Sequence, residues 1–189
     1  MSISNPTPRE REAQADNRLA EMILFIAQKC NGDPKFGATK LNKILFFADF
    51  FSFVKRGKPI VGCDFMRLGK GPAPRHMKPV RDSLVSAGRA VVQERQLVSG
   101  HTQHKVLALK EPDLSEFSGE DINFMLEIIC ALKPFSAEEV SELSHSHPAW
   151  EIAEDKESIP LEAAFIMSMD HEESDIATAL GLHKKLKHA

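Results

Sequence analysis

The sequence predicts an α+β fold, namely a mainly helical single domain with one small antiparallel β-hairpin. Apolar residues between positions 19 and 26 recur at the spacing i, i+3, i+4, i+7, which is typical of an amphipathic helix. Residues 41–54 are apolar at ten of fourteen positions, and a helix that is apolar nearly all round is buried on several sides. Two β-rich runs, 90–98 and 104–109, are joined through a Ser-Gly-His-Thr segment and predict the hairpin.

Two helices are predicted in the first third of the chain. Residues 1–11 hold two prolines and few apolar groups, which indicates a flexible N-terminal tail. The first helix then covers about 12–30 and ends at the Asn-Gly-Asp-Pro sequence of 31–34. The second helix, over 41–54, ends at the Gly-Lys-Pro sequence of 57–59, and we expect it to be the central helix of the fold.

An extended piece, a rigid turn and a third helix are predicted in the middle of the chain. Residues 60–68 are predicted to be extended, and the Gly-Lys-Gly-Pro-Ala-Pro sequence of 69–74 to form the turn. The third helix is predicted to start from this turn, since proline is tolerated in the first turn of a helix. The apolar residues at positions 77, 80, 84 and 87 predict that it continues to Gly88, where it ends.

The last third of the chain is predicted to be helical. Ser118 can cap a helix that Pro134 closes. The Ser-Ala-Glu-Glu sequence of 136–139 is a capping box that opens a second, short helix.

A single domain is predicted over residues 12–182. Its last part, 151–182, is expected to be a helical extension, with one helix after Pro160 and another capped by the Asp-His-Glu-Glu sequence that starts at Asp170. Residues 183–189 are predicted to form a basic tail.

The formal net charge of −3 conceals a strong asymmetry along the chain. Residues 1–54 are nearly neutral, at +1. Residues 55–105 carry eleven Lys and Arg against three Asp and Glu, a net charge of +8, whereas residues 106–189 carry six against eighteen, a net charge of −12. Nucleic acid, an acidic protein partner, or the chain's own acidic last third could neutralise the basic segment.

Length and composition indicate a cytoplasmic protein. A chain of 189 residues can bury a core without disulfides or metals, and its three cysteines are far apart, odd in number and without a CxxC pair. The N-terminus lacks a basic start followed by an apolar core, so no signal peptide is predicted. The apolar run at 22–27 is far shorter than the ~20 residues that span a bilayer, so we expect no membrane contact.

No constellation of residues points to an enzyme, a metal or a cofactor. The sequence has neither GxxxxGK[ST] nor HExxH, and Pro72 removes an N–H that a phosphate-binding loop would use. His145 and His147 lack a third and fourth metal ligand. The acids of 170–175 suit a helix N-terminus without any cation.

The basic segment leaves a DNA-binding alternative open. Arg75, Lys78 and Arg81 lie at helical spacing, opposite an apolar face, and a basic hairpin follows them. A helix followed by a basic hairpin is typical of a winged helix-turn-helix. Such a motif joins its helices by a turn of roughly 3–4 residues, whereas 19 residues separate Val54 from Pro74. A winged-helix-like transcriptional regulator is therefore the second hypothesis.

Four short motifs occur in a fixed order along the chain. They are Lys-Leu-Asn-Lys-Ile-Leu-Phe-Phe-Ala at 40–48, Gly-Lys-Pro-Ile at 57–60, Gly-Pro at 71–72 and Leu-Ser-His-Ser-His-Pro-Ala-Trp at 143–150. Together they resemble the SocA-like Panacea domain, over about 40–150. The chain departs from that family in having no tyrosine, because phenylalanine stands at positions 46 and 47, where the family often has tyrosine.

The resemblance implies an antitoxin that has no catalytic residues. Members of this family neutralise diverse small toxins by protein–protein contact or by aiding their proteolysis, and they are common on phage-derived and mobile DNA. The implied partners are a small protein toxin, encoded next to this chain, and a protease.

The motif residues are expected to serve the structure rather than chemistry. They are Lys40, Leu41, Lys43, Ile44, Leu45, Gly57, Pro59, Gly71, Pro72, His145, Pro148 and Trp150. We expect the apolar members and Phe47 to build the core, and Lys40 and Lys43 to lie on the polar edge of the helix and pair with acids of the C-terminal third. Charge alone suggests a partner-binding face made of Arg67, Lys70, Arg75, Lys78 and Arg81.

Overall fold

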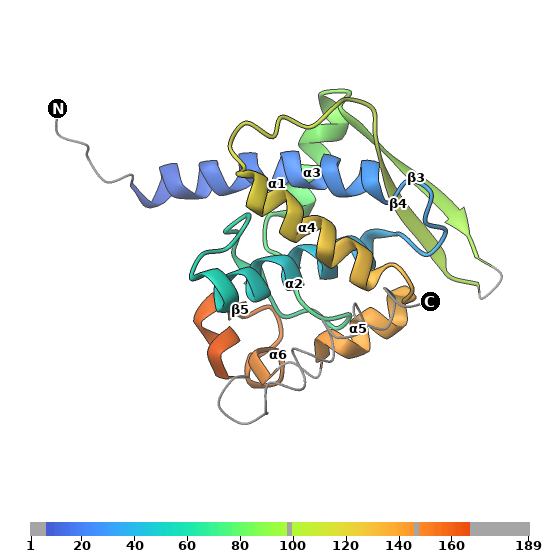
Figure 1. Cartoon of the computed structure of the whole chain (residues 1–189). Coiled ribbons are helices and arrows are strands. Elements are labelled where there is room, and N and C mark those ends of the chain that lie inside the picture. The colour runs from blue at the N-terminus through green and yellow to red at the C-terminus, as the bar shows by residue number, and fades with distance from the viewer. Residues whose placement is uncertain (1–6, 98–99, 146–147, 167–189) are drawn as a thin grey trace, which may run out of the picture.

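Helices dominate the computed structural model, which describes residues 7–97, 100–145 and 148–166. Its central element is α2 (Ala38–Arg56). In Figure 1, α1 (Pro8–Lys29) and α4 (Gly119–Leu132) lie above α2, and α5 (Ala137–His145) and α6 (Pro148–Ile152) lie below it. Mixed α+β structure with mainly helical content is thus confirmed, as is the central place of the second helix. Within the described residues, none of the helices has the length and hydropathy needed to cross a membrane.

Aromatic rings of α2 form the centre of the core. The Phe46 ring lies 4.2 Å from that of Phe50 and 5.5 Å from that of Phe65, measured between centroids. All three side chains are fully buried. The near-continuous apolar pattern of 41–54 therefore has a direct cause, since α2 packs against α4, α5, β4 (Thr102–Ala108) and the 3₁₀ helix at 161–166.

The first helix starts earlier than its apolar pattern predicts. Thr7 caps α1 by accepting a hydrogen bond from the Glu10 N–H, and the Glu10 carboxylate accepts one from the Thr7 N–H. Pro8 occupies the first helical position, where its missing N–H costs nothing. The prediction that residues 8–11 belong to a flexible tail is therefore wrong, because a capping box extends the helix beyond its apolar face.

A small three-stranded sheet joins the middle of the chain to its last third. Its order is β2 (Ala73–Pro74), β1 (Phe65–Met66) and β5 (Ser158–Ile159), all antiparallel. The predicted helical extension from residue 151 did not include this strand, in which Ile159 pairs with Phe65. After β5 the chain forms a short 3₁₀ helix (Leu161–Ile166). The predicted helix from Asp170 and the predicted basic tail lie outside the described residues.

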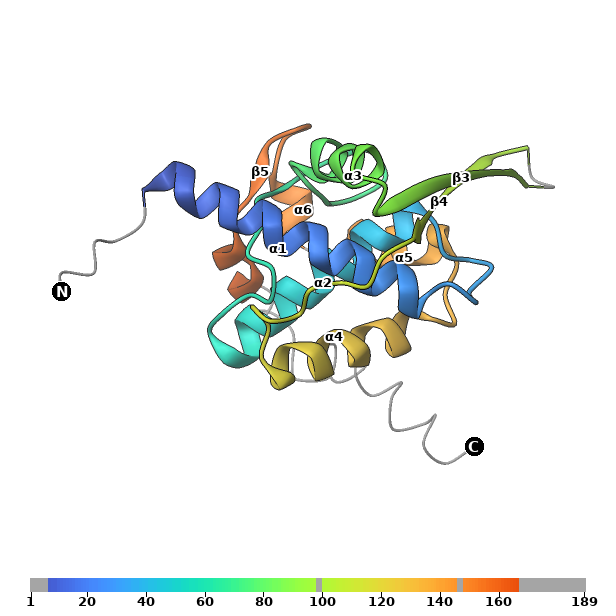
Figure 2. The same cartoon turned by 90° about the horizontal axis from the view of Figure 1, so that it is seen from above.

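The third helix and the hairpin are present, with small shifts at their ends. Helix α3 (Met77–Ser86) leads through Gly88, at φ 66°, into β3 (Ala90–Gln96) and β4 (Thr102–Ala108). Ala90 pairs with Ala108 at the base of this hairpin, and both strands project from the helical body in both views (Figures 1 and 2). The caps predicted at Ser118 and Ser136 both form, through Asp121 and Glu139.

Candidate partner-binding surfaces

Lys40 and Lys43 lie inside the protein, each with 1 % of its surface exposed. Their predicted place on a polar edge is wrong, since α2 is covered on all sides there. Lys40 Nζ donates to Asp33 Oδ2 at 2.8 Å and to the carbonyls of Lys133 and Phe135 at 3.0 and 2.8 Å. The acidic partner of Lys40 is therefore Asp33, in the loop after α1. The predicted pairing with acids of the C-terminal third is also wrong.

Lys43 fixes the Gly71-Pro72 turn from within. Its Nζ donates to the Pro72 carbonyl at 2.7 Å, and burial lowers the pKa of this amine to about 7. Gly71 has φ 88°, and a Cβ there would lie 2.7 Å from Lys43 Cε and would also clash with Ser144 Oγ. The two motifs therefore meet in space, because only glycine allows the turn to approach the lysine this closely.

A stack of side chains holds α5 and α6 against the same turn. The His145 ring stacks on the Trp150 ring, with centroids 4.0 Å apart, and the Arg67 guanidinium lies 4.2 Å from the Trp150 ring centroid. Arg67 also donates to the Ala153 carbonyl. Burial, together with the charges of Lys43 and Arg67, lowers the pKa of His145. Trp150 is half-buried, and Pro148 is the first residue of α6.

The Gly-Lys-Pro motif forms the turn after α2. Gly57 ends the helix at φ 73°, and Pro59 is half-buried in the loop that follows. Asp49, which the sequence reasoning missed, anchors this loop by accepting hydrogen bonds from the N–H groups of Ile60, Val61 and Gly62 at 2.7 to 2.9 Å. Burial raises the pKa of Asp49 to about 6, against the effect of these N–H donors. The sequence feature that could have indicated this role is an acidic residue within a nearly continuous apolar segment.

Most of the motif residues lie in the interior or in the turns packed against it. Leu41, Ile44, Leu45 and Phe47 are buried in the core. Within the described residues there is no cluster of three or more His, Cys, Asp or Glu side chains that could hold a metal ion.

The basic residues suggested as a partner face are largely paired within their own segment. Lys78 Nζ and Arg81 Nη2 both contact Asp82, at 2.6 and 2.8 Å. Arg75 contacts Asp64 at 2.7 Å and Ser158. Lys70 is exposed on the turn before Gly71, whereas the Arg67 guanidinium packs over the Trp150 ring.

Few ion pairs join the acidic last third to the basic segment in the part of the chain that the structure describes. Among the described residues, ion pairs between 55–105 and 106–189 involve Arg56 alone, which reaches Asp121 at 2.7 Å and Glu120 at 3.3 Å. Arg89 and His76 instead pair with acids of α1. Within the described residues, most basic side chains of 55–105 therefore have no acidic partner in the last third.

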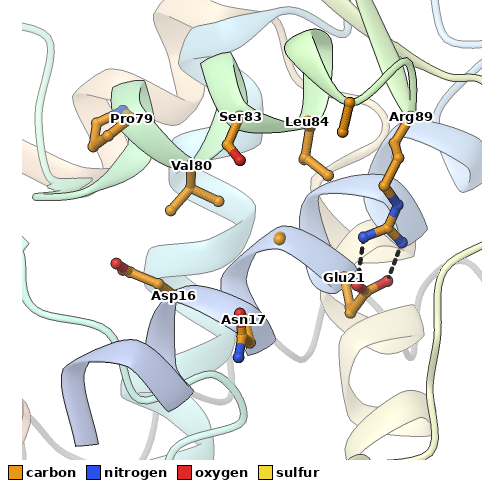
Figure 3. Close-up of a pocket in the computed structure, with 10 residues that line it drawn as sticks. Asp16, Asn17, Glu21, Pro79, Val80, Ser83, Leu84 and Arg89 are labelled. Atoms are coloured by element: carbon orange, nitrogen blue, oxygen red, sulfur yellow. Dashed lines mark hydrogen bonds and ion pairs between the residues drawn. The ribbon is translucent and has the colours of Figure 1, made fainter. Parts of the chain in front are cut away.

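A groove of about 330 Å³ runs between α1 and α3 (Figure 3). Its lining residues are Asp16, Asn17, Ala20, Glu21, Pro79, Val80, Ser83, Leu84, Ala87 and Arg89. Small and apolar side chains of α3 face α1 across it (Figure 3). No pattern in the sequence predicts this groove, because it depends on how two helices far apart in the chain pack together.

An ion pair lies at one end of the groove and a histidine–carboxylate hydrogen bond at the other. Arg89 donates to both carboxylate oxygens of Glu21, at 2.8 and 2.7 Å, as the dashed lines in Figure 3 show. Partial burial acts to raise the pKa of Glu21, but the Arg89 hydrogen bonds and the Asp113 N–H outweigh it and lower the pKa. At the other end, His76 Nδ1 lies 3.0 Å from the Asp16 carboxylate. The open middle, around Ser83, is lined by groups without charge.

The comparisons with known proteins give one match. The family model of the SocA-like antitoxin, Panacea domain, matches residues 41–151, more than half of the chain. No match was found among curated proteins or among solved structures.

Proposed function

Because the chain belongs to the SocA-like antitoxin family with the Panacea domain, we propose that it neutralises a small protein toxin by direct contact. The observation that carries the proposal is the preformed groove between α1 and α3. The motif residues of α2 and of the Gly71 turn are occupied in the interior, and the groove is a concave surface outside them. The groove is where we place the toxin.

The lining of the groove suits a side chain of a partner protein better than a reacting substrate. The two acidic residues of the lining already have partners: Glu21 pairs with Arg89, and Asp16 contacts His76. The rest of the lining includes the apolar residues Ala20, Val80 and Leu84. Interfaces take most of their affinity from apolar or aromatic anchors that fill such pockets. We therefore propose a binding protein rather than an enzyme.

Basic residues around α3 are proposed to assist the contact. Lys78 is 80 % exposed at its side chain, and Arg75 and Arg81 keep part of theirs accessible. With Lys70 they provide positive charge that can steer an acidic toxin surface toward the groove. Arg67 is assigned a positioning role, since it lies on Trp150.

DNA binding is the weaker candidate on the same surface. Lys78 and Arg81 share the Asp82 carboxylate on α3, and a carboxylate beside two cations opposes contact with phosphate. The apolar lining residues Ala20 and Leu84 also provide no positive charge or hydrogen-bond donor for a phosphate backbone.

Neutralisation by masking needs no protease. Experiments with purified toxin and purified chain therefore distinguish masking from neutralisation by proteolysis.

Co-expression with the product of the adjacent reading frame tests the proposal. We expect that product to stop growth alone and this chain to restore it. Ser83→Trp, which fills the middle of the groove, should abolish rescue, whereas Ser86→Trp, on the same helix but outside the groove, should retain it. Absence of a toxic neighbour, or equal rescue by both variants, contradicts the proposal. Retention of random duplex in a low-salt gel shift would favour DNA binding.

A further inference from the structure

The β3–β4 hairpin has two outer edges with different surroundings. It is a two-stranded sheet that projects beyond the helices (Figures 1 and 2). Each strand of such a ribbon bonds its neighbour with every second residue and points the backbone groups of the others outward. The outward groups either find partners elsewhere in the chain or stay available to another strand.

Two hydrogen bonds establish which backbone groups point outward. The Leu97 N–H donates to the His101 carbonyl at 2.9 Å, and the Leu109 N–H donates to the Arg89 carbonyl at 2.8 Å. Since the bonded positions alternate, Gln93 and Arg95 bond within the ribbon. The N–H and C=O groups of Val92, Glu94 and Gln96 therefore form the outer edge of β3.

The outer edge of β4 is covered by the loop after α1. A Cβ at Gly37 would lie 3.3 Å from the His104 carbonyl oxygen, so this loop runs directly beside β4. The Gln103 amide donates to the carbonyls of Pro34 and Phe36. Among the described residues, by contrast, no hydrogen bond reaches the outward backbone groups of Glu94 or Gln96, and both residues are exposed.

The side chains along β3 define the chemistry of a segment that would fit this edge. Val91 and Leu97 are exposed apolar residues, at 40 % and 36 %, on the same face of the ribbon. Arg95 lies between them on that face and has no ion pair within the described part of the chain. Glu94 points to the opposite face, where its Oε1 lies 3.3 Å from Nδ1 of His104.

We propose that the outer edge of β3 binds an extended segment of the toxin as a third strand. The segment carries a carboxylate opposite Arg95 and apolar side chains opposite Val91 and Leu97. Main-chain hydrogen bonds to Glu94 and Gln96 supply affinity, and the alternate side chains supply specificity. The edge continues the groove, because Arg89 ends the groove and β3 begins at the next residue.

A second copy of this chain fits the edge poorly. Pairing β3 with itself in antiparallel fashion allows registers centred on Gln93, Glu94 or Arg95. The register on Glu94 opposes two carboxylates, and the register on Arg95 opposes two guanidinium groups, which is destabilising. In none of the three does Arg95 face an acid, so charge favours a heterologous strand.

Amide hydrogen exchange in the complex with the toxin tests this inference, which rests on the proposed function. We expect the amides of Glu94 and Gln96 to exchange at least tenfold more slowly in the complex, as newly bonded amides do. The amides of Gln93 and Arg95, bonded in both states, should change little. If the toxin binds and the Glu94 and Gln96 amides are unchanged, the inference fails while the proposed function stands. If wild-type chain binds no toxin, the proposed function itself fails.

A matched pair of proline variants gives an independent readout. Gln96 and Thr102 lie opposite each other, and both outward N–H groups can be removed without loss of a ladder hydrogen bond. Either change also removes the same side-chain hydrogen bond, Gln96 Nε2 to Thr102 Oγ1. Gln96→Pro should weaken toxin binding about tenfold, and Thr102→Pro should not. Equal effects, or slower exchange at Glu94 that depends on protein concentration without toxin, overturn the inference.

Discussion

Lys43 is a buried amine with no acidic partner among the described residues, and its titration should be visible in the stability of the fold. Its pKa is about 7 in the folded protein against 10.5 for the unperturbed group. Between these values the unfolded state binds the extra proton, so this group makes the free energy of unfolding rise with pH from about 7 to 10.5. The stabilisation is fully present above about pH 10.5 and is lost progressively as the pH falls from there to about 7.

Replacement of this lysine should remove that rise. We expect the unfolding free energy of wild type to gain about 1 kcal/mol per pH unit between pH 7.5 and 9 relative to Lys43→Met. Urea titrations at four pH values measure the difference, and other titrating groups cancel because both proteins contain them. Lys58→Met, at an exposed position, should follow wild type. Parallel pH profiles for Lys43→Met and wild type would contradict the account.

Gly71 permits both a left-handed backbone and a close approach, and two variants separate these effects. Gly71→Ala should cost about 3 kcal/mol or more, because it adds a clash with Lys43 and Ser144 to the strain of a positive φ. Gly88→Ala has a positive φ but open space around it, so we expect a loss of about 1 kcal/mol. Chemical denaturation checks both values. A smaller loss at Gly71 than at Gly88 would be inconsistent with this packing.

Among the elements, α2 depends on Asp49 to hold the loop that follows it. The carboxylate accepts three backbone N–H groups, from Ile60, Val61 and Gly62. Asp49→Ala leaves these donors without a partner and should cost about 3 kcal/mol or more. Asp49→Asn keeps one acceptor oxygen and should cost less. Urea midpoints should therefore fall in the order wild type, Asn, Ala, and equal midpoints for the two variants would show that the loop does not need this anchor.

Local pattern was sufficient to predict α1 to α5 and the hairpin, but not the short helix α6. The spacing at 19–26 and the apolar run at 41–54 depend on residues close in the chain, as does the β-rich pair that forms β3 and β4. Strand β5 escaped prediction because its two residues become a strand only by pairing with Phe65 and Met66, more than ninety positions away. The start of α1 escaped because a cap, not an apolar face, determines it.

The motifs were recognisable in the sequence, but their environments were not. Lys40 and Lys43 look like surface residues by type, and their partners are carbonyls at Lys133, Phe135 and Pro72. Such contacts depend on the tertiary packing of α2. The groove between α1 and α3 has the same origin, since Asn17 and Ser83 are brought together only by packing.

Across the whole molecule, the fold separates an interior built from the motifs from an outer surface around α3. Within the described residues, Arg56 is the member of the basic segment that forms ion pairs with acids of the last third. The groove and the open edge of β3 meet at Arg89. One toxin can therefore contact both surfaces at once, which is the arrangement proposed here.

The central claim is neutralisation by contact at the α1–α3 groove, and isothermal titration of purified toxin with this chain tests it most directly. We expect saturable binding without nucleic acid or protease, with Ser83→Trp weakening the affinity by about a hundredfold, as loss of a buried anchor does. Ser86→Trp should bind like wild type, and thermal unfolding should show both variants to be folded. Absence of binding by folded wild type, or equal affinity of both variants, would contradict the account.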